Sequence, residues 1–238
     1  MGRSPHIVKN YKIIRVGIGL IAFAFPIVLA IGGYIGAGLR LEGSMSAYYH
    51  ASPATQQESD LDVRVPHQGE MRDWFVGFLF VLGTCLVLYK GFNPKEDKAL
   101  NVAGVLAIGV AIFPMAWGSY QGIEFTIVGV KLSLHGACAI VSFLCIAYVC
   151  IWLKNDTLVL IKDPDRKARY EKLYNLLGSL MIASPILAFV SMGVFRKHNS
   201  FTFFIEAWLL WVFAIYWIVK SKEISDSGAD ERAPNEDA

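Results

Sequence analysis

Six apolar segments, each close to the length of a membrane-spanning helix, dominate this sequence. A helix needs about 20 apolar residues to cross the hydrocarbon core of a bilayer. Only 18% of the residues are charged and 55% are hydrophobic, too few charges to cover a soluble domain. The sequence therefore predicts an all-α polytopic membrane protein, a bundle of six transmembrane helices. The expected spans are residues 16–39, 73–89, 100–118, 132–153, 173–195 and 201–219.

The distribution of Lys and Arg predicts the orientation of this bundle. With a cytoplasmic N-terminus, 16 of the 22 Lys and Arg residues fall on the inner side and 6 on the outer side. Positive residues accumulate in cytoplasmic loops, so we expect both termini inside, N-in and C-in. The expected location is a cell membrane, either a plasma membrane or a bacterial inner membrane.

The simple alternation of the spans predicts a single transmembrane domain over residues 1–222. Residues 223–238 are polar, acidic and free of aromatic side chains. A segment of that composition cannot bury enough apolar surface to fold, so we expect a disordered acidic cytoplasmic tail.

Several residues inside the spans predict local features of the helices. Pro114 and Pro185 should kink or end their helices, because proline lacks the backbone N–H. Gly32 and Gly36, four residues apart, should form a face that lets a neighbouring helix approach closely. All four cysteines lie within apolar runs, so no framework of loop disulfides is expected.

The longest polar interruption, residues 44–77, concentrates side chains that could carry chemistry. It opens with S-M-S-A-Y-Y-H and closes with R-D-W-F-V-G. We expect the opening stretch to fold back onto the outer mouth of the bundle. Two ionisable residues inside spans, His135 and Glu206, should lie at the same level, where burial is costly, and should pair with each other. The candidate binding residues are Ser44, Ser46, Tyr48, Tyr49, His50, Arg72, Asp73, His135 and Glu206.

These residues also have structural interpretations that the sequence leaves open. His135 is equally an interior histidine that is hydrogen-bonded to a neighbouring helix. Tyr48 and Tyr49 can simply anchor the bundle in the headgroup region, where ring and hydroxyl face different media. Glu206 is either paired or protonated.

The motifs of metal and cofactor chemistry are incomplete. Ser46, His50 and Asp73 are spaced similarly to the Ser, His and Asp of membrane ceramidases and adiponectin-receptor hydrolases, which bind zinc. Those proteins also need a His-x-x-x-His pair, whereas Ala139 follows His135 by four residues. No G-x-S-x-G, H-E-x-x-H or phosphate-binding glycine loop occurs. We therefore expect no metal and no cofactor. The sequence has no basic tract suited to nucleic acid, and the expected partners are membrane lipids.

Several motifs together resemble the DRAM/Frag/Sfk superfamily of six-helix membrane proteins. They are the S-x-S in the first outer loop, the H-G-A-C-A that begins at His135, and the last span, F-F-I-E-A-W-L-L-W-V-F-A-I-Y-W. The likeness covers most of residues 16–222 and is greatest to small bacterial members. Here Ala207 follows Glu206, which departs from the Glu-Trp-like motif of the superfamily. The resemblance implies a role in lipid or lipid-anchor handling and supplies no catalytic residue.

The expected function is that of an integral membrane protein with an outer-leaflet polar pocket that binds a lipid headgroup or another amphiphile. Arg72 would pair with a phosphate, and Asp73 or Glu206 with a cation or hydroxyl. In the alternative of a transporter or channel subunit, the same residues would line the outer vestibule of a path. In a third interpretation they only tie the helices together. The sequence does not decide whether the protein is an enzyme, nor its oligomeric state.

Overall fold

The computed structural model describes residues 5–51, 69, 71–118, 120–127, 130–194 and 200–231, which are mostly helical. The six long helices are α1 (Pro5–Ile27), α4 (Arg72–Leu88), α5 (Pro94–Ile112), α6 (Leu134–Trp152), α8 (Pro164–Val194) and α9 (Phe201–Ser227). The shorter elements are η1 (Val28–Gly32), α2 (Gly33–Ala37), η2 (Ser46–Tyr49), α7 (Asn155–Leu158), η4 (Ala229–Glu231), β1 (Glu124–Ile127) and β2 (Val130–Ser133).

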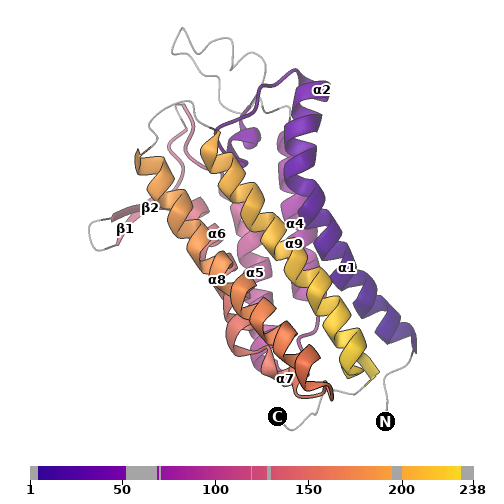
Figure 1. Ribbon diagram of the computed structural model, residues 1–238. Helices are drawn as coiled ribbons and strands as arrows, with labels where there is room; N and C mark the ends of the chain where they lie inside the picture. The colour runs from indigo at the N-terminus through magenta and orange to yellow at the C-terminus, as the bar shows by residue number, and fades with distance from the viewer. Residues whose placement is uncertain are drawn as a thin grey trace.

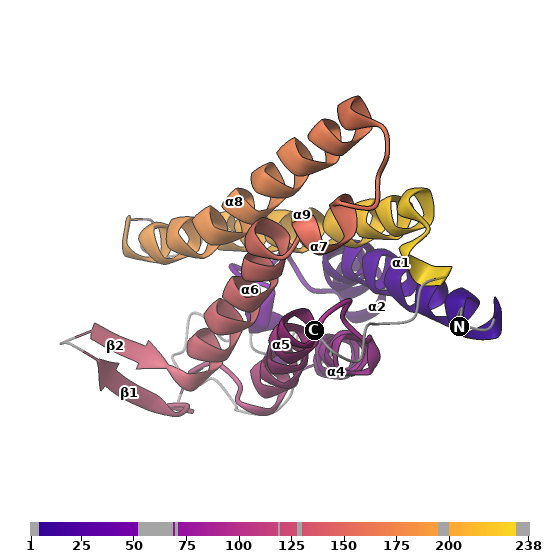
Figure 2. The same cartoon turned by 90° about the horizontal axis from the view of Figure 1, so that it is seen from below.

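The long helices run alternately up and down and form a closed ring (Figures 1 and 2). Each long helix packs against the next one along the chain, and α9 returns to pack against α1. We call the end where α1 begins and α9 ends the base. The opposite end, where α2 ends and α4, α6 and α9 begin, is the rim (Figure 1).

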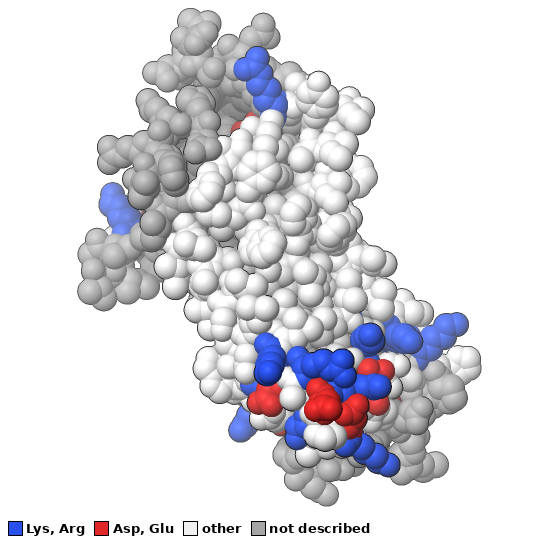
Figure 3. Space-filling view, in the orientation of Figure 1, with Lys and Arg blue, Asp and Glu red and all other residues white. Residues whose placement is uncertain are grey.

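Length and composition agree with insertion in a membrane. Among the described residues, three helical segments are long and apolar enough to cross a bilayer: Val8–Ala37, Leu134–Leu158 and Phe201–Ser227. On the face shown in Figure 3, Lys, Arg, Asp and Glu gather mainly at the base, and a wide band above them carries none. The structure thus supports the membrane class and the predominantly helical fold.

A small β-hairpin was not expected from the sequence. β1 and β2 pair antiparallel, with Glu124 opposite Ser133, and project from the side of the bundle between α5 and α6 (Figure 1). Ser133 then caps α6, because its hydroxyl accepts the Gly136 N–H at 3.0 Å. Ser133 is therefore both the last residue of β2 and the N-cap of α6.

Capping signals set the limits of α5, which begins six residues before the expected start at residue 100. The side chain of Asn93 accepts the backbone N–H groups of Lys95 and Glu96, both at 2.8 Å, and Pro94 occupies the first helical position. The helix ends at Ile112, as Pro114 predicted. α8, in contrast, does not end at Pro185 but continues to Val194.

The tail is the main correction to the predicted domain limits. We expected disorder from residue 223 onward, but α9 continues to Ser227. Gly228 then adopts a left-handed conformation (φ 68°), which turns the chain back onto α1. Asp230 accepts two hydrogen bonds from the buried guanidinium of Arg15, at 2.9 and 2.5 Å. Composition alone missed this partner; residues 232–238 lie outside the described part of the chain.

Candidate functional site

The stretch S-M-S-A-Y-Y-H closes the rim of the ring, as predicted. Its last residues form η2, in which Ala47 and Tyr48 are buried, and His50 follows it with a side chain that is also buried. The hydroxyl of Ser44 accepts the Ala47 N–H at 3.1 Å and so holds the first turn of η2. Tyr48 is fully buried and is therefore no headgroup anchor. Residues 52–68 of the same polar interruption lie outside the described residues.

Glu206 holds the chain just before η2. Its carboxylate Oε2 accepts the backbone N–H of Met45 at 2.6 Å, and the N–H of Phe203 donates to the Gly43 carbonyl at 3.0 Å. The first two turns of α9 thus fix the loop that leads into Ser46. The predicted pair between Glu206 and His135 is wrong, because this backbone amide reaches the carboxylate instead.

His135, at the start of α6, contacts three groups and is buried. Its Nδ1 lies 3.0 Å from the Val110 carbonyl oxygen and 2.9 Å from that of Phe113. Carbonyl oxygens only accept hydrogen bonds, so Nδ1 must carry the proton. In the neutral ring Nε2 is then an acceptor, and the hydroxyl of Ser46 donates to it at 2.8 Å.

The sequence explains why two carbonyls are available to His135. In a regular helix the Val110 carbonyl would accept the N–H of residue 114, four positions on. Residue 114 is proline and has no N–H, so α5 ends and the carbonyl needs another donor. The imidazole of His135 supplies it from the neighbouring helix. Pro114 therefore leaves the Val110 carbonyl available, and this carbonyl and that of Phe113 together hold the proton on Nδ1 of His135.

An aromatic group surrounds the second rim histidine. His50 lies with Nε2 3.2 Å from the Met115 carbonyl oxygen, and its ring stacks on Trp117 with centroids 5.7 Å apart. The ring of Tyr49 meets His50 edge-on, and the guanidinium of Arg72 lies 6.0 Å from the centre of the Tyr49 ring. These residues form one continuous packed group at the rim.

Asp73 does not belong to this group. Its side chain is 95% exposed, and its carboxylate lies 3.8 Å from Arg72 Nε, a loose surface pair. Ser46, His50 and Asp73 therefore do not converge as the zinc-site spacing would require. In the described part of the chain, no three His, Cys, Asp or Glu side chains are close enough together to hold a metal ion.

Burial also affects the phenol of Tyr48. Loss of solvent raises its pKa above the ordinary value, so the hydroxyl stays protonated at neutral pH. It lies 3.5 Å from the backbone N–H of Glu42, and the ring packs against Phe203. Tyr48 is thus a structural member of the rim, wedged between η2 and α9.

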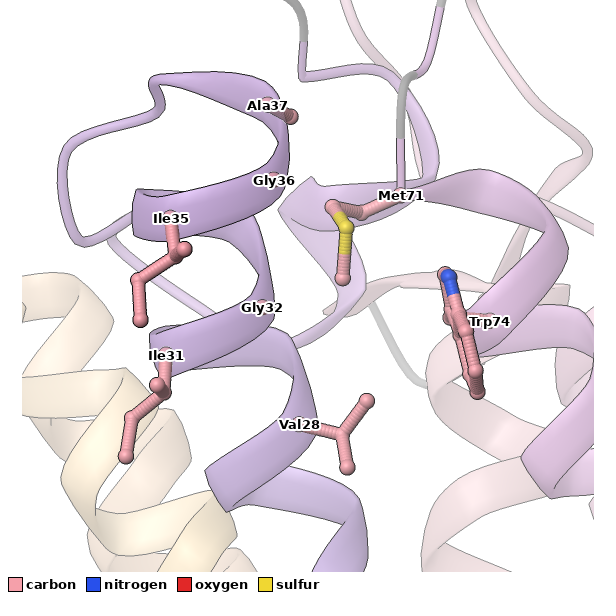
Figure 4. A pocket seen from close by; sticks show the side chains of 8 residues that line it. All are labelled: Val28, Ile31, Gly32, Ile35, Gly36, Ala37, Met71 and Trp74. Atoms are coloured by element: carbon pink, nitrogen blue, oxygen red, sulfur yellow. The ribbon is translucent and has the colours of Figure 1, made fainter.

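An apolar groove opens beside the rim, between the α1–η1–α2 helix and the start of α4 (Figure 4). Its volume is about 480 Å³. The helix widens to a π-helical turn at η1, just after Pro26, and such turns are frequent at functional sites. The groove is lined by Val28, Ile31, Gly32, Ile35, Gly36, Ala37, Met71 and Trp74.

The predicted glycine face borders this groove instead of a tightly packed helix. A Cβ atom added at Gly36 would meet no atom within 4 Å, and one at Gly32 would meet only Met71 and Val28, at 3.4 Å or more. The absence of side chains at these glycines therefore leaves space for the groove. From the sequence alone, the same motif predicted close packing of a neighbouring helix.

A second cluster of ionisable residues, which sequence reasoning missed, lies buried at the base. Lys220 Nζ donates to Thr157 Oγ1 at 3.0 Å and lies 3.6 Å from Glu223 and 3.9 Å from Glu96. The hydroxyls of Thr157 and Tyr174 both donate to Glu223 Oε2. Lys220 and Glu223 are three residues apart, a spacing that predicts an ion pair on one helix face. Both lie outside the expected last span, residues 201–219, so the pair is not among the expected site residues.

Comparison of the chain with protein-family models, with curated protein sequences and with solved structures found no match. The function must therefore be argued from the geometry of the rim, the groove and the base.

Proposed function

We propose that this protein is a six-span integral membrane protein that binds a membrane amphiphile at its rim. The hydrocarbon chain occupies the apolar groove, and an anionic headgroup lies beside Arg72. The proposed orientation is N-in and C-in, in a plasma membrane or bacterial inner membrane, so that the rim faces outward. The groove is the observation that carries this proposal.

The groove has the size and lining of a lipid-chain site. Its volume of about 480 Å³ falls within the range of roughly 300–1,000 Å³ that is common for ligand pockets. It opens on the outer wall of the bundle, where Ile31 and Ile35 are 55% and 77% exposed and Trp74 is 56% exposed. Tryptophan is typical of the membrane–water interface, which supports a proposed position of the groove mouth at headgroup depth.

Arg72 is the proposed headgroup contact. It follows Met71 and precedes Trp74 by two residues, and both of these line the groove. Its side chain is 38% exposed, and its contact with Asp73 is loose, at 3.8 Å. A guanidinium offers paired N–H donors that match phosphate or carboxylate oxygens. The resemblance to the DRAM/Frag/Sfk superfamily, with its implied lipid handling, adds support.

The transporter alternative finds less support. The polar groups at the rim and the ionic cluster at the base are separated by a core that contains the buried apolar side chains of Phe75, Leu82, Phe213 and Ile146. Ion pathways are lined by rings of charged groups or backbone carbonyls along their length. Between the rim and the base, the described core contains packed aromatic rings and aliphatic side chains.

The test is a comparison of lipids that co-purify with the wild type, Gly36→Phe and Gly17→Phe. Both glycines are helical and have no atom within 4 Å of an added Cβ, but only Gly36 lines the groove. We expect mass spectrometry to find a bound lipid class in the wild type and in Gly17→Phe. Gly36→Phe should lose most of it, because the new ring fills the groove.

Arg72→Gln tests the headgroup contact separately. We expect this variant to lose anionic lipids and to retain neutral lipids. The substitution removes the guanidinium charge that would pair with an anionic headgroup, and it leaves the groove unchanged. Equal lipid content in all variants, or no bound lipid in the wild type, would refute the proposed site.

A further inference from the structure

We propose that Ser46 and His135 form a nucleophile–base pair that cleaves an ester bond of an amphiphile bound at the rim. The observation behind it is the hydrogen bond from Ser46 Oγ to His135 Nε2 at 2.8 Å, in a ring whose other nitrogen is fixed by two carbonyls. That the ester belongs to a membrane amphiphile rests on the proposed function; the reactivity of Ser46 does not.

The geometry satisfies the requirements for activating a serine. The serine and its base lie within the 2.6–3.2 Å needed for proton transfer. A third group must orient the base and hold its tautomer. Here the carbonyls of Val110 and Phe113 do this, in the place that a carboxylate often takes. Because they fix the proton on Nδ1, the lone pair of Nε2 points at the Ser46 hydroxyl.

The surroundings separate an accessible nucleophile from a shielded base. Ser46 is partly exposed at the start of η2, whereas His135 is only 8% exposed. Glu206 holds the preceding residue, Met45, through its backbone N–H at 2.6 Å. We assign Glu206 as a positioning residue, because it fixes the backbone that carries the nucleophile and does not contact the imidazole.

η2, the element that carries Ser46, packs beside the groove through Tyr48. Tyr48 of η2 lies against Gly33, and a Cβ added at Gly33 would come within 2.9 Å of the Tyr48 ring and 3.7 Å of Met71. Met71 lines the groove. An amphiphile with its chain in the groove would therefore present the bonds near its headgroup to the η2 side of the rim.

The reaction is acyl transfer in two steps. Ser46 Oγ attacks the ester carbonyl carbon while its proton passes to His135 Nε2; the ester C–O bond breaks and the leaving alkoxide takes that proton. Water then attacks the acyl-serine, gives a proton to Nε2, and releases a carboxylic acid as the proton returns to Ser46. The two carbonyls stabilise the transient imidazolium through Nδ1–H. No oxidant or metal is required.

The test uses the full-length protein in detergent and a fluorophosphonate probe, which forms a covalent bond with activated serine hydroxyls. We expect peptide mass spectrometry to locate the label on Ser46, and Ser46→Ala to remove it. His135→Gln should slow labelling by roughly 100-fold or more, the lower range for loss of a general base. Ser142→Ala removes a buried α6 hydroxyl that donates to the Ala103 carbonyl, and it should label like the wild type.

A second variant and a pH profile separate a catalytic role of His135 from a structural one. Pro114→Ala restores an N–H that can take the Val110 carbonyl and leaves His135 Nδ1 with the Phe113 carbonyl alone. Nitrogen NMR of the imidazole should therefore show a larger share of the other tautomer than in the wild type, and labelling should be slower. In the wild type the labelling rate should fall in acid as the imidazole protonates. In folded His135→Gln this acid dependence should be absent.

Two results would overturn the pair: no label on Ser46 in wild-type protein that is folded by its thermal melt, or equal labelling rates in the wild type and His135→Gln. Lipid content is measured on the same samples. Bound lipid without Ser46 labelling refutes the pair and leaves the proposed function. Ser46 labelling without bound lipid refutes the lipid site and leaves the pair.

Discussion

Single backbone groups decide the chemistry of the rim. Glu206 is satisfied by the Met45 N–H, and His135 by two carbonyls that the absence of an N–H on Pro114 leaves available. Reasoning from side chains alone pairs an acid such as Glu206 with a base such as His135. Buried backbone N–H and C=O groups compete for the same partners, because leaving them unpaired costs free energy. Here they compete successfully at both residues.

At this scale we predict opposite results for two substitutions of Glu206. Gln keeps an oxygen that accepts the Met45 N–H, so Glu206→Gln should melt close to the wild type. Leu removes the acceptor and strands a buried amide, which costs about 1–3 kcal/mol. Thermal melts in detergent check this; equal melting of Glu206→Leu and the wild type would show that the contact contributes nothing.

At the scale of elements, the base is held together by charge and hydrogen bonds between helix ends. Glu96 lies in the first turn of α5, Thr157 in α7, Tyr174 in α8, and Lys220 and Glu223 near the end of α9. The side chains of Lys220, Glu96 and Glu223 are 3%, 1% and 0% exposed. Lys220 therefore neutralises two carboxylates that water does not reach.

We predict that Lys220→Met strongly destabilises the bundle. Removal of the cation leaves Glu96 and Glu223 buried without it, and breaking a buried ion pair in this way costs about 3–5 kcal/mol. Lys222→Met is the matched control, because Lys222 is exposed two residues further along the same helix. A large fall in the melting temperature of Lys220→Met alone is expected; similar melts for the two variants would contradict this role.

At the scale of the whole molecule, the alternating ring places the two polar regions at opposite ends. The rim carries η2, the two histidines and the mouth of the groove, whereas the base carries most of the charged side chains on the face shown in Figure 3. The excess of Lys and Arg in the base segments predicts that the base is cytoplasmic.

This orientation predicts the labelling of single added cysteines in intact cells. A membrane-impermeant maleimide should modify Glu124→Cys, in the exposed β1 strand near the rim, and should not modify Lys222→Cys at the base. The native cysteines lie within α4 and α6, which limits background labelling. The reverse pattern would invert the protein and place the rim in the cytoplasm.

Hydropathy determined the six apolar helices and their alternation, because apolar length is a local property that each segment carries by itself. Capping residues such as Asn93 and Ser133 determined helix starts just as locally, although apolar runs alone misplaced the start of α5. The expected docking of S-M-S-A-Y-Y-H at the rim is also confirmed, since adjacent tyrosines and small residues favour burial over solvent.

Only the tertiary structure decided which groups meet. Arg15 and Asp230 are 215 positions apart, and Ser46 and His135 are 89 apart. No local periodicity encodes such pairs, because they depend on the ring closing with α9 against α1 and on η2 packing against α4, α6 and α9. The sequence therefore determined the long helices and the residues to consider, whereas packing determined that Ser46 faces His135, that Glu206 holds the backbone, and that Gly36 borders a groove.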